Sequence, residues 1–564
     1  MYQTLTIPVP SSGLQINFCK NPYCKNFGVT PQTEDLLNNY ELITDENRGG
    51  VLRCSLCKTI AILKSNEGVQ DEYKRLDFLP SVAPSLCCPT VDCENSSKSV
   101  EESPNLYHKF GVTAYGKPRF RCKICKKTFT KKSHRRQHRR PETNVRIFLA
   151  LVNRLPFNRI CEMENIRSKT LYDKLDFIYE CCRIFARNQE EQLKNTERSV
   201  FLSVDTKNFY LNWKKSSHRK NVCLQTVSTV EVSSGYVLGC HSNIDLSVSL
   251  NKLEKEIALE KSCCQKKEET DSISKYLLSN DYGQNTDLSD NLIECTYQGL
   301  LGDVEVKYNE LIHRKDFGVE EVFNKHTSPP NEGIQVRFDY TLYGHFYWLK
   351  QILPKNSRKA FYLAYDSSLR EACLSIFKDS VRKKTSELFY IRSEKNLSVT
   401  QRRKKVKNSS NPFREYQNKH KGMSVREAEL SLIKERMKEM AVIGHWKDHW
   451  LTHPISHMGE PGKVVSHLTN TGNLSDEILS EYYLDASLFP VKRFYDRLQN
   501  RVSVLSEDTT ELPTAKWNTY GAYKPSVLIK LIEIFRIYHN YILTDRYGET
   551  PAQRIGLSKK TYLG

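Results

Sequence analysis

The sequence predicts a multidomain α+β protein with two small cysteine-rich modules, a short helical domain, and a larger domain that mixes strands and helices. Three observations carry this prediction. A duplicated pattern of cysteine pairs comes first, helical periodicity follows it, and strand-like runs then alternate with helical ones. At 564 residues with 39% hydrophobic residues, the chain is long enough to build several packed cores.

The cysteine pairs occur in two copies of one spacing. The copies are Cys19-x4-Cys24 with Cys54-x2-Cys57, and Cys88-x4-Cys93 with Cys122-x2-Cys125. The pairs are separated by 29 residues in the first copy and by 28 in the second, and each copy contains Phe-Gly-Val, at 27–29 and at 110–112. Incidental buried thiols would not repeat in this way. Four thiolates on two short loops close a tetrahedral Zn²⁺ site, so we expect tandem zinc ribbons at 1–64 and 80–140, with two structural Zn²⁺ ions.

A rival grouping joins Cys122 and Cys125 to His134 and His138 as a zinc-finger helix. Only eight residues separate Cys125 from His134. Such a finger uses about 12 residues there. We therefore assign both histidines to the basic segment that follows the second ribbon.

This basic segment occupies 126–140. A charge run is usually a solvated face, but this one lies between a zinc ribbon and a helical domain, where phosphate contacts would hold a recognition helix in register. We expect DNA contacts from Lys126, Lys127, Lys131, Lys132, Arg135, Arg136, Arg139 and Arg140.

Residues 141–190 predict a helix-turn-helix of three short-linked helices. NVRIFLALVNRL is amphipathic, Pro156 stands where a second helix would begin, and Ser168 is the predicted N-cap of a third. The N-terminal half of that third helix would enter a major groove. We expect it to contact DNA through Ser168, Lys169, Thr170 and Lys174, and an ordinary three-helix linker is the alternative.

Composition agrees with a polyanion partner. The chain has 85 Lys+Arg against 66 Asp+Glu, a formal net charge of +19. Its 18 cysteines are spread through a long charged sequence, which indicates a reducing compartment rather than a secreted disulfide scaffold. No apolar run is long enough for a membrane span and MYQTLTIPVP is no signal peptide, so we expect a cytoplasmic, nucleoid-associated protein with no membrane partner.

Strand patterns begin after residue 198, and two of them end in an aspartate. SVFLSVDTKNFYLNW carries Asp205, two further runs meet at the hairpin signal Ser233-Ser234-Gly235, and KAFYLAYDSSLREACLSIF predicts a strand that ends at Asp366 before a helix. Ribonuclease H-like nucleases are built in this way, with carboxylates on adjacent strands holding two divalent ions about 4 Å apart. Oxygen-rich sites of this kind suit Mg²⁺, so we expect Asp205 and Asp366 to bind two Mg²⁺ ions.

The ribonuclease H-like α/β core is predicted to span 198–245 and 346–564, with a helical C-terminus. Residues 246–345 are polar and mixed, and we expect an insertion of helices and loops there. EAELSLIKERMKEM and VLIKLIEIFRIYHNYI are the clearest tail helices. Trp446 and Trp450 lie four residues apart, which favours helical core packing over a metal or stacking role for HWKDHWLTHPISH.

The order of these parts resembles the DDE class of bacterial insertion-sequence transposases. The closing segment IEIFRIYHNYILTDRYGETPAQRIGL is similar to the family's last helix, with an Asn near its end, then Thr-Pro-Ala and Gly-Leu. The resemblance covers most of the chain, least of all the insertion. It implies a Mg²⁺-dependent enzyme that binds both element ends and target double-stranded DNA, cleaves at the ends, transfers strands, and works as a homo-oligomer.

The chain departs from the family at the third acid. In the family a Glu begins a helix in a pattern like Val-Glu-Arg-Phe, and the best match here is Val491-Lys492-Arg493-Phe494, with Lys492 in the acid's place. A charged lysine repels Mg²⁺. Candidate substitutes are Asp485, Asp496 and Glu507. Two functions therefore stay open: an active transposase, or a catalytically inactive, transposase-derived DNA-binding protein or regulator.

Overall fold

The computed structural model divides into two compact units, which are described separately. Unit 1 comprises Met1–Asp77 and Gln189–Gly564, and unit 2 comprises Phe78–Asn188. The structure describes residues 7–31, 39–45, 49–79, 86–90, 93–96, 98–100, 103–113, 118–130, 141–213, 219–262, 273–282, 296–313, 326–394, 397–420, 422–470, 472, 474–505, 517, 519–559 and 561.

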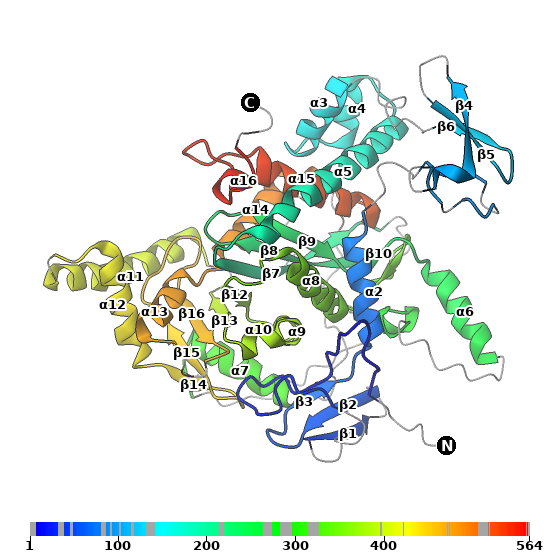
Figure 1. Ribbon diagram of the computed structural model, residues 1–564. Helices are drawn as coiled ribbons and strands as arrows, with labels where there is room; N and C mark the ends of the chain where they lie inside the picture. The colour runs from blue at the N-terminus through cyan, green and yellow to red at the C-terminus, as the bar shows by residue number, and fades with distance from the viewer. Residues whose placement is uncertain are drawn as a thin grey trace. The chain divides into compact units, whose positions relative to one another are not determined.

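A mixed eight-stranded sheet forms the centre of unit 1, in the order β14-β15-β16-β13-β12-β7-β8-β9 (Figure 1). β12 is parallel to both β7 and β13, and all other neighbours in this sheet are antiparallel. The strands are β7 (Val200–Leu211), β8 (Val222–Glu231), β9 (Val237–Ser242), β12 (Lys359–Ala364), β13 (Ser386–Ser393), β14 (Ala441–Ile443), β15 (Asp448–Thr452) and β16 (Lys463–His467).

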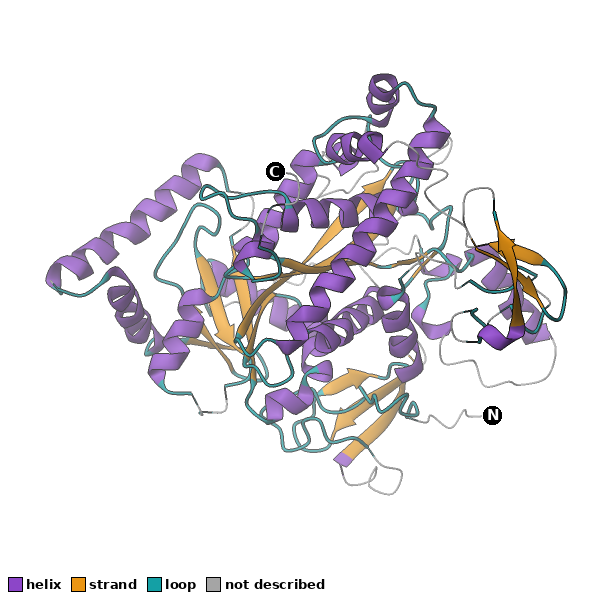
Figure 2. Cartoon of the chain, turned by 45° about the horizontal axis from the view of Figure 1, so that its top comes forward, coloured by secondary structure: helices purple, strands orange, loops and turns teal. Residues whose placement is uncertain are grey.

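Helices cover both faces of this sheet (Figure 2). Thr229 Oγ1 on β8 lies 2.7 Å from His345 Nε2 on helix α8, whereas its neighbour Ser228 bonds Tyr495 on helix α14. Because successive strand residues point to opposite faces, α8 and α14 pack on opposite sides. The flanking helices are α8 (Phe338–Ile352), α9 (Ser367–Ile376), α13 (Asp476–Asp485), α14 (Phe489–Arg501), α15 (Pro525–Tyr541) and α16 (Pro551–Arg554).

The first cysteine module belongs to unit 1, together with a small three-stranded sheet and a helix. The sequence predicted two tandem modules, and the structure places them in different units. The module's elements are β1 (Tyr40–Asp45), β2 (Gly49–Cys54), β3 (Ile60–Ile62) and α2 (Asn66–Asp77).

Unit 2 holds the second module and the three predicted helices. The module's strands form an antiparallel sheet in the order β4-β5-β6. Pro156 is the N-cap of the second helix, as predicted, whereas Ser168 is the first residue inside the third helix rather than its cap. The elements are β4 (Tyr107–Val112), β5 (Pro118–Cys122), β6 (Thr128–Thr130), α3 (Pro141–Leu151), α4 (Phe157–Glu164) and α5 (Ser168–Glu190), whose last residues lie in unit 1.

The segment expected to be an insertion contains helices, short strands and undescribed stretches. Its strand β11 pairs with β10, which lies just before the predicted insertion, and α8 spans residue 345, so the expected boundary falls inside a helix. The described elements are β10 (Ile244–Asp245), α6 (Leu250–Ser262), α7 (Leu300–His313) and β11 (Ile334–Gln335).

The helix expected around Trp446 and Trp450 is wrong. Trp446 lies in the turn between β14 and β15, and Trp450 lies in β15 with its side chain fully buried. Within β15 the neighbouring His449 is exposed, so burial alternates there as in a strand. A spacing of four fits this turn and strand as well as a helix. The tail helices α12 (Val425–Met437) and α15 are confirmed.

Three buried histidines make the stability of unit 1 depend on pH. Burial lowers the pKa of His345, His453 and His539 to about 3. In the unfolded chain their pKa is about 6.5, so the unfolded state takes up protons that the folded state does not. The contribution of these histidines to the free energy of unfolding is therefore full above pH 6.5 and falls as the pH drops from about 6.5 towards about 3. We expect each histidine to cost about 2 kcal/mol of stability at pH 5 relative to pH 7.5.

Urea midpoints at pH 7.5 and pH 5 measure this effect. A His345→Gln variant should lose about a third of the pH dependence. His420 is exposed, so a His420→Gln variant should keep all of it. Equal pH dependence in the unmodified protein and both variants would contradict the assignment.

Candidate metal centres and the aspartate-bearing sheet edge

The eight paired cysteines gather into two groups of four, as the spacing predicted. In each group the ligating atoms all lie within 4.8 Å of one another. The facing sulfur atoms are 3.4 Å and 3.7 Å apart in the first group and 3.2 Å and 3.8 Å apart in the second. A tetrahedral Zn²⁺ ion with Zn–S bonds of about 2.3 Å places its sulfurs about 3.8 Å apart. Both groups are therefore compatible with four-thiolate zinc sites.

The two groups have the same pattern of hydrogen bonds around their thiols. The Cys19 N–H donates to Tyr40 Oη over 3.1 Å, and the Cys88 N–H donates to Tyr107 Oη over 3.3 Å. Each tyrosine in turn donates to a backbone carbonyl of its own module, at 2.9 Å and 2.8 Å. Sequence reasoning missed this pair, because Tyr40 lies 16 residues after the second cysteine of its copy and Tyr107 lies 14 after its own.

An asparagine beside each group donates to a ligand sulfur. Asn26 Nδ2 lies 3.4 Å from Cys54 Sγ, and Asn95 Nδ2 lies 3.4 Å from Cys122 Sγ. Burial raises the pKa of Cys54, but backbone N–H donors and Asn26 outweigh it and lower this pKa to about 7. A lowered pKa favours the thiolate, the form that binds metal. Both asparagines come two residues after the second cysteine of their copy, a signal that aligning the copies could have found.

The repeated Phe-Gly-Val does not mark equivalent positions. Gly28 lies in the loop after Cys24, whereas Gly111 lies near the end of β4. Both glycines have positive φ, 70° and 74°, which glycine adopts at the least cost. Gly28 serves a turn and Gly111 a register shift within β4, so this part of the apparent repeat is coincidental.

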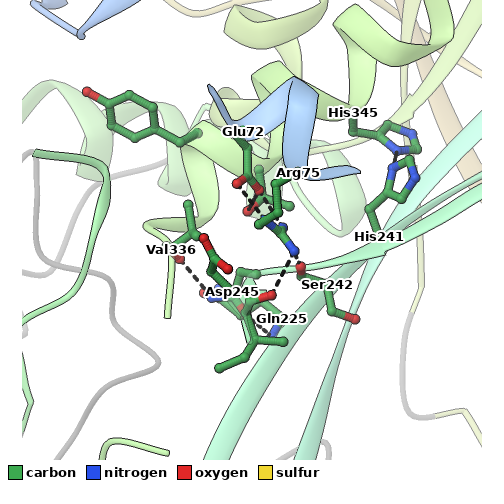
Figure 3. A network of polar contacts seen from close by, with 12 residues as sticks. Glu72, Arg75, Gln225, His241, Ser242, Asp245, Val336 and His345 are labelled. Carbon is green, nitrogen blue, oxygen red and sulfur yellow. Dashed lines mark hydrogen bonds and ion pairs between the residues drawn. The ribbon is translucent and has the colours of Figure 1, made fainter. Parts of the chain in front are cut away.

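Polar contacts fasten the first cysteine module to the sheet and its helices. On the α2 side, Lys64 forms an ion pair with Asp339 on α8, and Thr341 Oγ1 donates to Glu72 Oε1 over 2.9 Å. Arg75 binds Glu72 and also donates to the Ser242 and Ile244 carbonyls at 2.9 Å and 2.7 Å (Figure 3). All of these α8 partners lie more than 260 residues away along the chain.

A second set of contacts leads from the turn that carries Cys57 to the helix that follows Asp366. Trp446 Nε1 donates to Thr59 Oγ1 over 3.0 Å, two residues after the ligand Cys57. The Arg370 guanidinium lies 4.0 Å from the centroid of the Trp446 ring and pairs with Asp448 at 2.7 Å. Arg370 belongs to α9, so the first cysteine module supports the helix that Asp366 caps.

Asp205 and Asp366 lie at the same edge of the central sheet. Their strands β7 and β12 are parallel neighbours, and Val204 is opposite Leu363 in the register. Asp205 is therefore one residue beyond the last pair and Asp366 three residues beyond it. The prediction that Asp205 ends its strand is wrong, because β7 continues to Leu211 along its pairing with β8. The Asp366 carboxylate accepts from the N–H groups of Ser368 and Leu369, at 2.8 Å and 3.3 Å, as the N-cap of α9. Both aspartates are half-buried, and Asp205 Oδ1 accepts from the Thr206 N–H over 2.8 Å.

Helix α14 crosses this edge and carries Lys492. The ammonium of Lys492 donates to Ser393 Oγ at the end of β13 over 2.6 Å, and Tyr495 Oη donates to the Asp205 carbonyl over 3.3 Å. Asp496 follows Tyr495 and is exposed, one turn beyond Lys492. Lys492 thus lies at the carboxyl end of β13.

No third acid completes a metal-binding group with Asp205 and Asp366 among the residues that the structure describes. Asp485, at the end of α13, lies 3.9 Å from Arg426. Glu507 lies outside the described residues. Of the candidates, only Asp496 is on the helix that contacts the Asp205 strand.

The expected DNA-contacting residues fall into three groups. Lys126 and Lys127 lie in the turn between β5 and β6, and Ser168, Lys169 and Thr170 are exposed at the start of α5. Residues 131–140, with their six expected phosphate contacts, lie outside the described residues. Lys174 differs, because it is 7% exposed and its Nζ donates to Asn144 Oδ1 over 2.6 Å, which joins α5 to α3.

Comparisons with protein-family models, curated proteins and solved structures find no match to this chain. Within the described ranges, no helix is both long and apolar enough to span a bilayer.

Proposed function

We propose that this chain is a DNA transposase that binds the ends of a mobile element and catalyses Mg²⁺-dependent strand cleavage and strand transfer. One observation carries the proposal: the register of the parallel strands β7 and β12, which places Asp205, within β7, beside the carboxyl end of β12, where Asp366 follows. Around them, β7–β9 form an antiparallel meander, and β12 runs beside β7 into helix α9. This arrangement supports a ribonuclease H-like core.

The chemistry follows from the two carboxylates. Asp205 and Asp366 would hold Mg²⁺, which supplies activation of water or a 3′-hydroxyl for attack on a phosphodiester. Asp366 is oriented by the two N–H groups it accepts, so its free carboxylate oxygen has a fixed direction. Tyr495 donates to the Asp205 backbone carbonyl, and the Asp205 carboxylate accepts from the Thr206 N–H over 2.8 Å.

The DNA-binding part of the proposal rests on unit 2. Its four-cysteine module precedes three helices, and α5 presents Ser168, Lys169 and Thr170 to solvent at its N-terminal end. A recognition helix uses that end to reach base edges. Pairing of two element ends would require at least a dimer.

Lys492 favours a second function, that of a transposase-derived DNA-binding regulator without catalysis. Its ammonium is fixed on Ser393 at the edge where the aspartates lie, and positive charge there opposes Mg²⁺ binding. The two functions share DNA binding and differ in cleavage.

A cleavage assay separates them. The substrate is a duplex carrying the terminal sequence of the DNA segment that encodes the chain, incubated with Mg²⁺ or Mn²⁺. We expect the unmodified protein to nick and join it. Binding without cleavage would contradict the enzymatic proposal, and cleavage by a Lys492→Glu variant alone would establish the regulator.

A further inference from the structure

Helix α11 (Val399–Lys419) is a strongly basic helix with an exposed outer face. It carries Arg402, Arg403, Lys404, Lys405, Lys407, Arg414 and Lys419 against the single acid Glu415. None of its side chains is buried. Its half-buried side includes Val406, Phe413 and Tyr416, and the opposite side is exposed and polar.

One face of α11 is attached to the rest of unit 1. Lys405 pairs with Glu394 at 2.5 Å, just beyond the end of β13, and Ser409 Oγ accepts from the Ser456 N–H at 3.3 Å. Lys405 and Ser409 are four residues apart and share one side of the helix. This attachment fixes which side of α11 points outward.

The outward side is a stripe of cations. Arg403, Lys407 and Arg414 follow each other at spacings of four and seven, and they share a helix face that Lys404 extends. All four are exposed, and none forms an ion pair within the described part of the chain. From Arg403 to Arg414 the stripe covers about 16 Å of a regular helix.

This pattern is unfavourable for the helix alone. The first turn has no acidic residue, although the helix dipole favours anions there. Arg403 and Lys407 are also like charges at i and i+4, which destabilises a helix. Charges that destabilise the helix they lie on indicate a functional surface. An anionic partner would relieve both the missing negative charge in the first turn and the repulsion between Arg403 and Lys407.

The position of α11 relates it to the aspartate-bearing edge. β13 is parallel to β12, so its carboxyl end lies at the edge that Asp205 and Asp366 share. Only four residues separate Ser393, at the end of β13, from the capping residue Ser398. In Figure 1, α11 and α12 form a helical pair that projects from the β14–β16 side of this sheet.

We infer that the cationic stripe of α11, formed by Arg403, Lys404, Lys407 and Arg414, binds the phosphate backbone of duplex DNA. The inference takes its partner from the proposed function but does not depend on catalysis. Duplex DNA carries one charge per about 1.7 Å of axis, so a stripe of this length can contact several phosphates. A membrane partner is disfavoured, since Val399 in the first turn is the one large apolar residue exposed along α11, too little apolar surface to insert into lipid.

The test uses the full chain and a 30-base-pair duplex of random sequence, with binding followed by fluorescence anisotropy over a range of NaCl concentrations. One variant combines Arg403→Gln, Lys404→Gln, Lys407→Gln and Arg414→Gln. The control removes the same charge from four exposed cations elsewhere in unit 1, through Lys355→Gln, Arg358→Gln, Lys383→Gln and Lys524→Gln.

Each lost phosphate contact lowers the salt slope of log K by about 0.9. We expect the stripe variant to lose a slope of about 3 and at least about tenfold in affinity near 0.1 M salt, and the control to lose less than half as much. Equal losses in the two variants, or an unchanged slope, would overturn the inference. A double Arg403→Gln, Lys407→Gln variant, expected to lose about half the slope, serves if the fourfold variant unfolds.

Two further outcomes separate the explanations. Tighter, stripe-dependent binding of duplex RNA than of duplex DNA would overturn the choice of DNA. If the unmodified protein does not cleave but the stripe variant still loses DNA affinity, the catalytic proposal fails and this inference stands.

Discussion

An Asp366→Asn variant should lose Mg²⁺-dependent strand cleavage by about a thousandfold or more while keeping its fold. Asparagine caps helices about as well as aspartate, so the amide oxygen can still accept from Ser368 and Leu369 and hold the start of α9. Only the negative charge is lost, and with it one Mg²⁺ ligand. An Asp205→Asn variant should behave in the same way.

The matched control is Asp476→Asn. Asp476 is an exposed carboxylate in the first turn of α13, away from the aspartate-bearing edge. Cleavage rates should be unchanged in the control, and DNA affinity should be unchanged in all three variants. Mg²⁺ should raise the Tm of the unmodified protein and of the control but not that of Asp366→Asn, because only a bound ligand stabilises the folded state. Full cleavage by Asp366→Asn would refute the assignment.

Loss of the first zinc site should destabilise the whole of unit 1, whereas loss of the second should affect unit 2 alone. A Cys54→Ser variant removes one thiolate from the first group, and structural zinc contributes several kcal/mol or more to folding. The damage should spread, because Lys20, next to the ligand Cys19, lies 2.5 Å from Ser375 Oγ on α9 and Thr59 holds Trp446. Cys122→Ser is the matched change in the second group.

The measurements are zinc content and thermal unfolding. The unmodified chain should contain about two Zn²⁺ ions and each variant about one. Cys54→Ser should lower the main transition of unit 1 and weaken cleavage, whereas Cys122→Ser should leave that transition in place and weaken DNA binding. Identical effects of the two substitutions on unit 1 would disprove the different roles, and a metal-free unmodified protein would disprove both zinc sites.

The sequence predicted the parts of this protein that have a short-range pattern. The cysteine spacing predicted both ligand groups, and the apolar runs predicted β7, β8, β9 and the strand before Asp366. The shared edge of Asp205 and Asp366 followed from the order of strands and helices. Each cysteine group and each of these strands is encoded within about 40 residues of chain.

Features that depend on distant contacts were not predictable. The first cysteine module joins unit 1 through pairs such as Lys64 with Asp339, which leave no periodic signal. The β14–β16 extension was mistaken for a helix, because Trp446 and Trp450 have a spacing that a turn followed by a strand also allows. The third acid stays a prediction, since Lys492 occupies its place and Glu507 lies outside the described residues.

The different surroundings of the two cysteine modules bear on how this protein can evolve. In the first module, Lys64, Glu72 and Thr59 are constrained by partners in the core, so a substitution there needs a compensating change elsewhere. The second module has its own small core and belongs to a separate unit. Its surface can change without cost to the central sheet. We therefore expect the second module to accept substitutions that change its DNA preference, whereas the first module is held constant by its contacts.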